Sequence, residues 1–179
     1  MATITAALVK ELRDKTSAGM MDCKKALREA AGDLEKAVDI LRKSGKSKAA
    51  KRGGKTAAEG KVLATVAADQ KVGFILEINS ETDFVSRDAH FKELAQKIAE
   101  KGLANKSKDV AATLSNDDGG HSLEHAREAL AAKIGENIQL RRVTLLESDN
   151  YVGHYSHGDR IAVLLALSTA NETLAKDLA

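Results

Sequence analysis

Residues 72–78, Val72-Gly73-Phe74-Ile75-Leu76-Glu77-Ile78, form the apolar stretch around which the rest of the chain is organised. A short apolar run of this length, bounded by polar residues, predicts a buried β-strand. Upstream, Val62, Ala64 and Val66 alternate with other residues, which indicates a second strand. Residues 69–71, Asp-Gln-Lys, suit a tight turn between the two. The stretch therefore predicts an antiparallel hairpin.

Helical spacing takes over after this hairpin. A long amphipathic helix is expected from about Asp88, and residues 106–120 are polar enough to suggest a loop. Strands mixed with helices in this order are typical of an α+β fold with an antiparallel sheet. The further elements expected are a helix from Ser122 to about Ile134, strands over 138–145, 151–154 and 161–167, and a last helix opened by Asn171 or Glu172.

The N-terminal part has a different pattern. Apolar residues recur at helical spacing over 4–16, over 21–31 and after Asp33, with breaks at Gly19 and Gly32 and an expected end at Gly45. Three short helices joined by short connections predict a compact bundle, near the lower size limit for independent folding. We expect this bundle at 1–45, a basic linker at 46–60, the first half of the α+β core at 61–140, and the start of an incomplete second half at 141–179.

The expected linker carries a marked positive charge. Lys46, Lys48, Lys51, Arg52 and Lys55 are not interrupted by an acidic residue between Lys46 and Ala58, although the net charge of the chain is only +2. Such a stripe binds phosphate backbones or an acidic protein face in some proteins, and in others it is a solvated surface. Both readings stay open on charge alone.

Composition narrows the class of protein. With 179 residues, 43% hydrophobic and 30% charged, the chain suits a globular fold of one medium or two small domains. The longest apolar run, 161–167, is too short to span a bilayer, and the N-terminus lacks the pattern of a secretory signal. A single cysteine, Cys23, fits a reducing compartment. We therefore expect a cytoplasmic protein with no membrane association.

Motifs for nucleotide or metal chemistry are weak. Gly54-Lys55-Thr56 and Gly45-Lys46-Ser47 resemble the end of a phosphate-binding loop, but Ala49 and Ile40 stand where its earlier glycine is required. Four of the five histidines form two close pairs, and a zinc site needs three or four converging ligands. A metalloenzyme built on them is thus the weaker alternative, and we expect no metal and no cofactor. The pairs are His121 with His125 and His154 with His157.

Several residues suggest a binding surface instead. Phe84, in Thr82-Asp83-Phe84-Val85, is one of only three phenylalanines and lies among polar residues just past the expected strand. It is either a wedge presented to a partner or a core residue at the strand end, and position alone does not decide between them. Met20 and Met21 suit an adaptable contact surface or a core plug. Gly135, after Ile134, suits a helix cap.

The motifs taken in order resemble bacterial translation elongation factor Ts, and the resemblance runs the length of the chain. Each motif alone is weak, whereas the ordered set is highly specific. The matching stretches are 4–13 (ITAALVKELR), 19–27 (GMMDCKKAL), 42–45 (RKSG), 82–85 (TDFV), 133–138 (KIGENI) and 157–161 (HGDRI).

The resemblance implies a guanine nucleotide exchange factor that binds elongation factor Tu and accelerates GDP release by binding, without enzymatic chemistry. It implies that Asp83 and Phe84, with Thr82 and Val85, disturb the magnesium site of the partner. Neither direct nucleotide binding nor nucleic-acid binding is expected. Members of the family continue with a helical hairpin and the rest of the second half-core. The other contact residues implied are Met20, Met21, Lys24, Ile134, Gly135 and His157.

The bundle also resembles ubiquitin-associated domains. With the basic segment after it, the bundle suggests a second class of function, a nucleic-acid or ribosome-binding adaptor. Binding through phosphate contacts would weaken steeply with salt, which distinguishes this alternative from a salt-tolerant protein partner.

Overall fold

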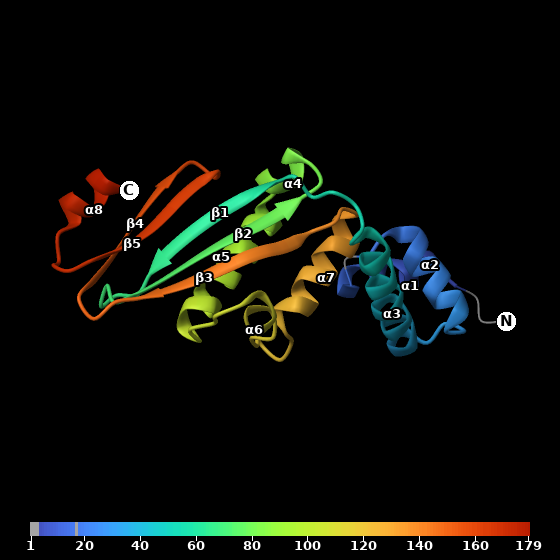
Figure 1. The fold of residues 1–179 in the computed structure, drawn as a ribbon. Coiled ribbons are helices and arrows are strands. Elements are labelled where there is room, and N and C mark those ends of the chain that lie inside the picture. The colour runs from blue at the N-terminus through green and yellow to red at the C-terminus, as the bar shows by residue number, and fades with distance from the viewer. Residues whose placement is uncertain (1–3, 17) are drawn as a thin grey trace. The chain divides into compact units, whose positions relative to one another are not determined.

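The computed structural model describes residues 4–16 and 18–179, and the backbone alone of 46–52. Helices and antiparallel sheet occur together, which confirms the expected α+β class (Figure 1). The chain divides into two compact units. One consists of Met1–Gly54 with Glu128–Glu136, and the other of Lys55–Arg127 with Asn137–Ala179.

Three helices form the N-terminal bundle of the first unit: α1 (Ala6–Thr16), α2 (Met20–Glu29) and α3 (Leu34–Arg52). Gly32, at φ 88°, ends the connection after α2, and the Asp33 side chain accepts a hydrogen bond from the Lys36 N–H at 3.0 Å to start α3. Apolar positions one turn apart meet in a single core. Its buried members are Val9, Leu12, Cys23, Ala26, Leu27, Ala30 and Ala37.

Helix α3 corrects one expectation. It continues through Gly45 to Arg52, so the first part of the expected basic linker has a helical backbone. A glycine inside a helix costs only about 1 kcal/mol, which neighbouring turns can outweigh. A Cβ at Gly45 would lie 3.5 Å from that of Ala132, an ordinary contact. The side chains of residues 46–52, which carry most of the basic charge, lie outside what is described.

The second unit is organised on a three-stranded antiparallel sheet with the quoted stretch at its centre. Strand β2 (Val72–Ser80) lies between β1 (Glu59–Val66) and β3 (Gln139–Glu147). The expected hairpin turn is present: Gln70 adopts φ 55°, and Asp69 accepts a hydrogen bond from the Lys71 N–H at 3.1 Å. The register of β2 with β3 shifts between Glu77 and Ile78, which marks a bulge or irregularity.

Helix α5 (Ala89–Ala104) contacts β1 and β2 and buries the apolar positions expected for it. Phe74 and Phe91 are both fully buried. The helix comes very close to the sheet at Gly102, where an added Cβ would stand 2.4 Å from Cζ of Phe74. Any larger residue at this position would clash with Phe74, so the close packing requires glycine.

Two of the remaining helices were not expected from the sequence. Helix α4 (Asp83–Arg87) follows β2 directly, and α6 (Val110–Leu114) lies inside the stretch predicted to be a loop. Each has five residues, too few to show helical periodicity. Helix α7 (Leu123–Ile134) agrees with expectation within a residue.

The C-terminal part forms a hairpin and a short helix. Strands β4 (Tyr151–His157) and β5 (Ile161–Leu167) are antiparallel, and α8 (Glu172–Leu178) is capped by the Asn171 side chain. The Val152 N–H donates to the Gln70 carbonyl at 2.6 Å, which fixes the hairpin to the β1–β2 turn. Every residue of β5 is aliphatic, yet none of them is buried. Among the described residues, no helix is long and apolar enough to cross a membrane.

Candidate partner-binding site

Helix α4 presents its phenylalanine to solvent. Thr82 is extended and Asp83 begins the helix, so Phe84 and Val85 leave it in different directions. Val85 is 7% exposed, whereas Phe84 is 81% exposed. Of the two alternatives left open by the sequence, the outward placement holds, because Phe84 is not a core residue at the strand end. An exposed aromatic on a short fixed helix suits an interface anchor.

Short-range hydrogen bonds fix this helix at both ends. Ser80 donates to the Thr82 carbonyl at 2.9 Å, and Ser86 donates to the Asp83 carbonyl at 2.9 Å. The Asp88 N–H reaches the Val85 carbonyl at 3.0 Å, so the chain turns directly into α5. Asp83 also pairs with Arg87 at 3.0 Å, and we give this exposed pair little weight. The backbone that carries Phe84 is therefore well defined.

A polar cluster supports α4 from the strand side. Glu81 accepts a hydrogen bond from the Asn137 N–H at 2.7 Å and pairs with Lys55 Nζ at 3.3 Å. The buried Asn137 side chain donates to the Lys55 carbonyl at 2.8 Å. Three segments far apart in sequence thus meet directly beneath Thr82. This cluster could not be predicted from the sequence, because each member is a common polar residue.

The turn between β4 and β5 carries His157. His157 is exposed at the end of β4, and its Nδ1 lies 3.5 Å from the Tyr155 hydroxyl. Gly158 adopts φ 59°, so the turn uses the left-handed region that glycine enters freely. Lys61 pairs with Asp159 across the sheet edge, and this ammonium holds the pKa of the Asp159 carboxyl below its usual range.

The other predicted contact residues lie in the first unit. Met20 and Met21 open α2 and are 59% and 73% exposed, so they are not core plugs. Lys24, one turn later, is also exposed. Cys23, by contrast, is fully buried. Methionines on an open surface adapt to a partner's shape.

Ile134 and Gly135 form the C-terminal end of α7. Ile134 is half-buried, and Gly135 adopts φ 88° while its N–H donates to the Ala131 carbonyl at 2.8 Å. This is the left-handed helix ending that glycine favours. The geometry of Gly135 is thereby explained by local structure. Its contact role stays a prediction.

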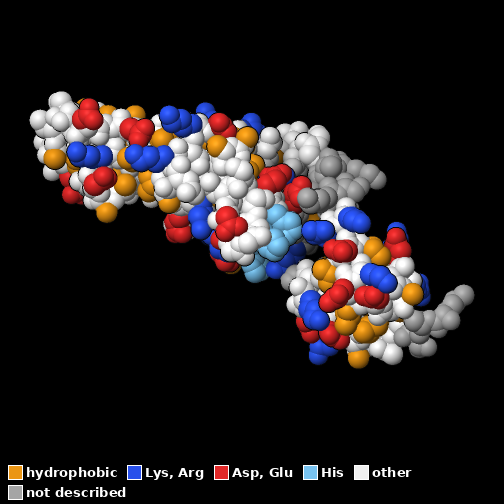
Figure 2. All heavy atoms as spheres, turned by 90° about the horizontal axis from the view of Figure 1, so that it is seen from below, with side chains coloured by type: hydrophobic (Ala, Val, Ile, Leu, Met, Phe, Trp, Pro, Cys, Tyr) orange, Lys and Arg blue, Asp and Glu red, His pale blue; other side chains and the backbone are white. Residues whose placement is uncertain are grey.

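The remaining histidines do not assemble a ligand set. His121 and His125 stack with ring centroids 4.7 Å apart. Within the described part of the chain, no group of three or more His, Cys, Asp or Glu side chains could hold a metal ion. On the face shown in Figure 2, acidic and basic side chains are intermingled over the described surface.

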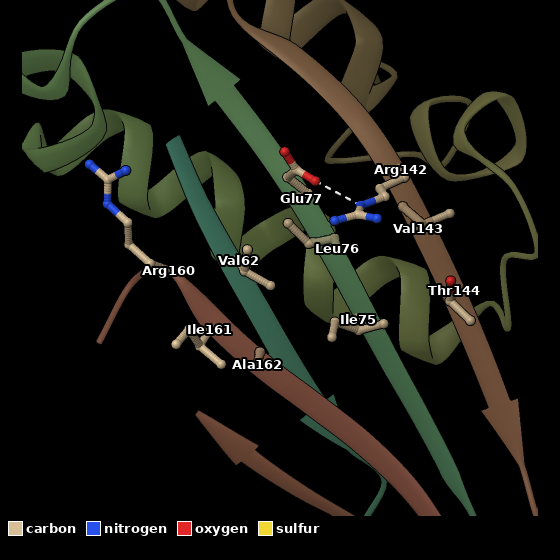
Figure 3. A pocket seen from close by; sticks show the side chains of 10 residues that line it. All are labelled: Val62, Ile75, Leu76, Glu77, Arg142, Val143, Thr144, Arg160, Ile161 and Ala162. Atoms are coloured by element: carbon tan, nitrogen blue, oxygen red, sulfur yellow. Dashed lines mark hydrogen bonds and ion pairs between the residues drawn. The ribbon is translucent and has the colours of Figure 1, made fainter. Parts of the chain in front are cut away.

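An open pocket of about 360 Å³ lies on the sheet (Figure 3). Both arginines at its rim are engaged: Arg142 bonds Glu77 at 2.7 Å, and Arg160 bonds Glu59 at 2.5 Å. The pocket has an apolar floor, and we assign no ligand to it. Its lining residues are Val62, Ile75, Leu76, Glu77, Arg142, Val143, Thr144, Arg160, Ile161 and Ala162.

Comparison with known proteins places the sequence of the chain in a family. A family model described as Elongation factor TS matches residues 81–179. A protein of Coxiella burnetii named Elongation factor Ts is 57% identical over 182 residues, covering all of this chain and 62% of the relative. Proteins of the same name from Arthrospira platensis and Aeromonas salmonicida are 53% and 54% identical; the matches cover the whole chain and 73% and 60% of those relatives. The chain thus spans about three fifths of the length of the Coxiella and Aeromonas relatives. With identity this high along its full length, the chain belongs to the elongation factor Ts family.

Proposed function

We propose that this chain is a cytoplasmic translation elongation factor that binds elongation factor Tu in its GDP form and promotes release of GDP. The exposure of Phe84 carries the proposal. A large aromatic side chain held 81% exposed on a fixed helix supports a role as anchor or wedge. Asp83 beside it adds a carboxylate suited to perturbing a magnesium site through charge.

Release by this route needs only binding energy. A ligand shifts a conformational equilibrium by its differential affinity for the two states. A partner that prefers the nucleotide-free or magnesium-distorted state therefore weakens GDP, and nucleotide weakens that partner by the same factor. GTP can then rebind and displace the exchange factor. No covalent step is involved, so the protein acts as an exchange factor and not as an enzyme.

The required energy matches the proposed surface. An acceleration of about ten-thousand-fold corresponds to a barrier lowered by roughly 5.5 kcal/mol. Interface hot spots contribute about 2–4 kcal/mol each on truncation, so one aromatic and a few neighbours suffice in magnitude. We assign the principal role to Thr82–Val85, and supporting contacts to His157, Met20, Met21, Lys24, Ile134 and Gly135.

Truncating the anchor tests this function. Phe84→Ala should slow stimulated release of fluorescent GDP from elongation factor Tu by roughly thirty-fold to a thousand-fold, the rate equivalent of a hot spot. Stopped-flow fluorescence measures the rate. Because the ring is exposed, the thermal unfolding midpoint should change little.

A second exposed apolar residue provides the control. Leu178 on α8 is 63% exposed and lies outside the proposed contacts, so Leu178→Ala should stimulate release like the parent. Parental activity of Phe84→Ala would show that the wedge assignment is wrong. If the chain binds RNA with an affinity that falls steeply as salt concentration rises, and does not affect GDP release, the adaptor function would be favoured instead.

A further inference from the structure

Strand β1 connects the two parts of the second unit that carry proposed contact residues. It contacts α4, which presents Phe84, and it also contacts the β4–β5 hairpin, whose turn follows His157. In Figure 1 the hairpin lies alongside β1. The first half of the strand makes specific polar bonds to the turn, and we call these bonds the β1 clasp.

The β1 clasp consists of two ion pairs and one backbone hydrogen bond. Lys61 pairs with Asp159, and Glu59 pairs with Arg160 at 2.5 Å. Next to Lys61, the Val62 N–H donates to the Asp159 carbonyl at 2.8 Å. These three bonds, made by Glu59, Lys61 and Val62, restrain both the position and the rotation of the turn.

The environment of Lys61 distinguishes the clasp from an ordinary surface ion pair. Exposed pairs contribute little, since solvent screens them and both side chains lose freedom. The Lys61 side chain is only 17% exposed, so leaving its ammonium without a partner would carry a desolvation cost. Asp159 is that partner, 98 residues away in sequence.

The same end of β1 is coupled to α4. Glu59 stands opposite Ser80 in the β1–β2 register, and the Ser80 hydroxyl donates to the Thr82 carbonyl at 2.9 Å. From Arg160 to Thr82 the chain of contacts therefore passes through Glu59 and Ser80. Each step is a backbone pairing or a direct bond within one unit.

We propose that Lys61, Asp159, Glu59 and Arg160 are positioning residues that hold the His157 turn in a fixed geometry relative to the Phe84 helix. The two contact elements would then meet the partner as one preorganised surface. Preorganisation strengthens binding because less freedom is lost on association. The positioning effect is a property of this chain alone, whereas its consequence for GDP release rests on the proposed function.

Spin-label distances test the positioning directly. In a Cys23→Ala background, nitroxides would be placed at Ala89, beside α4, and at Ser156, beside His157; both positions are exposed. The distance distribution between them should be narrow in the parent and broader in Lys61→Met. Lys71→Met serves as the matched control, because Lys71 is an exposed lysine in the β1–β2 turn.

Charge exchange separates positioning from general stability. The double variant Lys61→Asp with Asp159→Lys restores an ion pair, so it should regain a narrow distribution. If Lys61→Met fails to fold, Asp159→Asn takes its place and should broaden the distribution in the same way. A distribution unchanged from the parent in whichever single variant folds would overturn the proposal.

The functional consequence is measured separately. Lys61→Met should slow stimulated GDP release by roughly three-fold to ten-fold, in line with coupling between contacting groups, and the charge exchange should recover it. If Lys61→Met broadens the distance distribution but releases GDP at the parental rate, the clasp has a structural role only, and its link to partner binding is overturned. If Phe84→Ala also leaves release unchanged, the proposed function fails while the spin-label result still stands.

Discussion

At the scale of single residues, the three phenylalanines divide by environment. Phe74 and Phe91 are fully buried between the sheet and α5, whereas Phe84 is 81% exposed. Leaving an aromatic ring in water forgoes the roughly 1.5–3 kcal/mol that burial contributes. The fold therefore gains little from burying Phe84, which is consistent with a role at an interface.

Gly102 is the position at which one methyl group should matter most. In Gly102→Ala the new Cβ would stand 2.4 Å from Cζ of Phe74, whose side chain is fully buried. Overpacking of this kind costs about 1–3 kcal/mol. Urea denaturation should show that loss. Gly54→Ala, with no atom within 4 Å of its added Cβ, should stay within about 0.5 kcal/mol of the parent.

At the scale of elements, Asp88 ends α4 and starts α5. Its backbone N–H closes the last turn of α4, while its carboxylate accepts from the N–H groups of His90 at 2.8 Å and Phe91 at 3.4 Å. A single residue thereby sets the angle between the helix that presents Phe84 and the helix that packs on the sheet.

Removing this cap should weaken α5. Asp88→Ala leaves two N–H groups without the carboxylate, and we expect a loss of about 1 kcal/mol in the free energy of unfolding. Asp88→Asn retains an oxygen acceptor and should stay close to the parent. Circular dichroism during urea denaturation measures both. Equal destabilisation by Ala and Asn would contradict the capping role.

Elements with clear periodicity were predicted from the sequence. The run 72–78 indicated β2, and the spacing of Phe91, Leu94 and Ile98 indicated α5. Helix α4 was missed because five residues show no period, and α3 was ended too early because one glycine costs a helix only about 1 kcal/mol and did not stop it at Gly45. The roles of the candidate residues in contacting elongation factor Tu came from the family resemblance. Sequence position alone left Phe84 undecided between core and surface.

At the scale of the whole molecule, the chain contains separate apolar cores. The bundle core holds Leu12 and Leu27, and the sheet packs Leu76 and Ile78 under α5. Contacts across long sequence separations hold the second unit together, and these are invisible in sequence patterns. The pairs of Lys61 with Asp159 and of Glu59 with Arg160 could not be predicted. The chain contains many acidic residues, and the sequence does not indicate which of them lies near a given lysine or arginine.

Core truncations should therefore act locally. Leu27→Ala, at a fully buried position, should cost about 2–5 kcal/mol and raise hydrogen exchange in α1–α3. Leu76→Ala should raise exchange in β1–β3 and α5 instead. Hydrogen exchange followed by mass spectrometry distinguishes the two patterns. Uniform loss of protection along the chain in both variants would show a single cooperative unit.

The aliphatic strand β5 has a consequence for handling the protein. A run of seven such residues with no charge and no proline, none of them buried, has the composition that drives edge-to-edge aggregation. Concentrated solutions should therefore aggregate, as measured by light scattering, at lower protein concentration than the modest hydrophobic content of the chain suggests. A gatekeeper lysine in place of Ile161, which is 53% exposed, is the natural remedy.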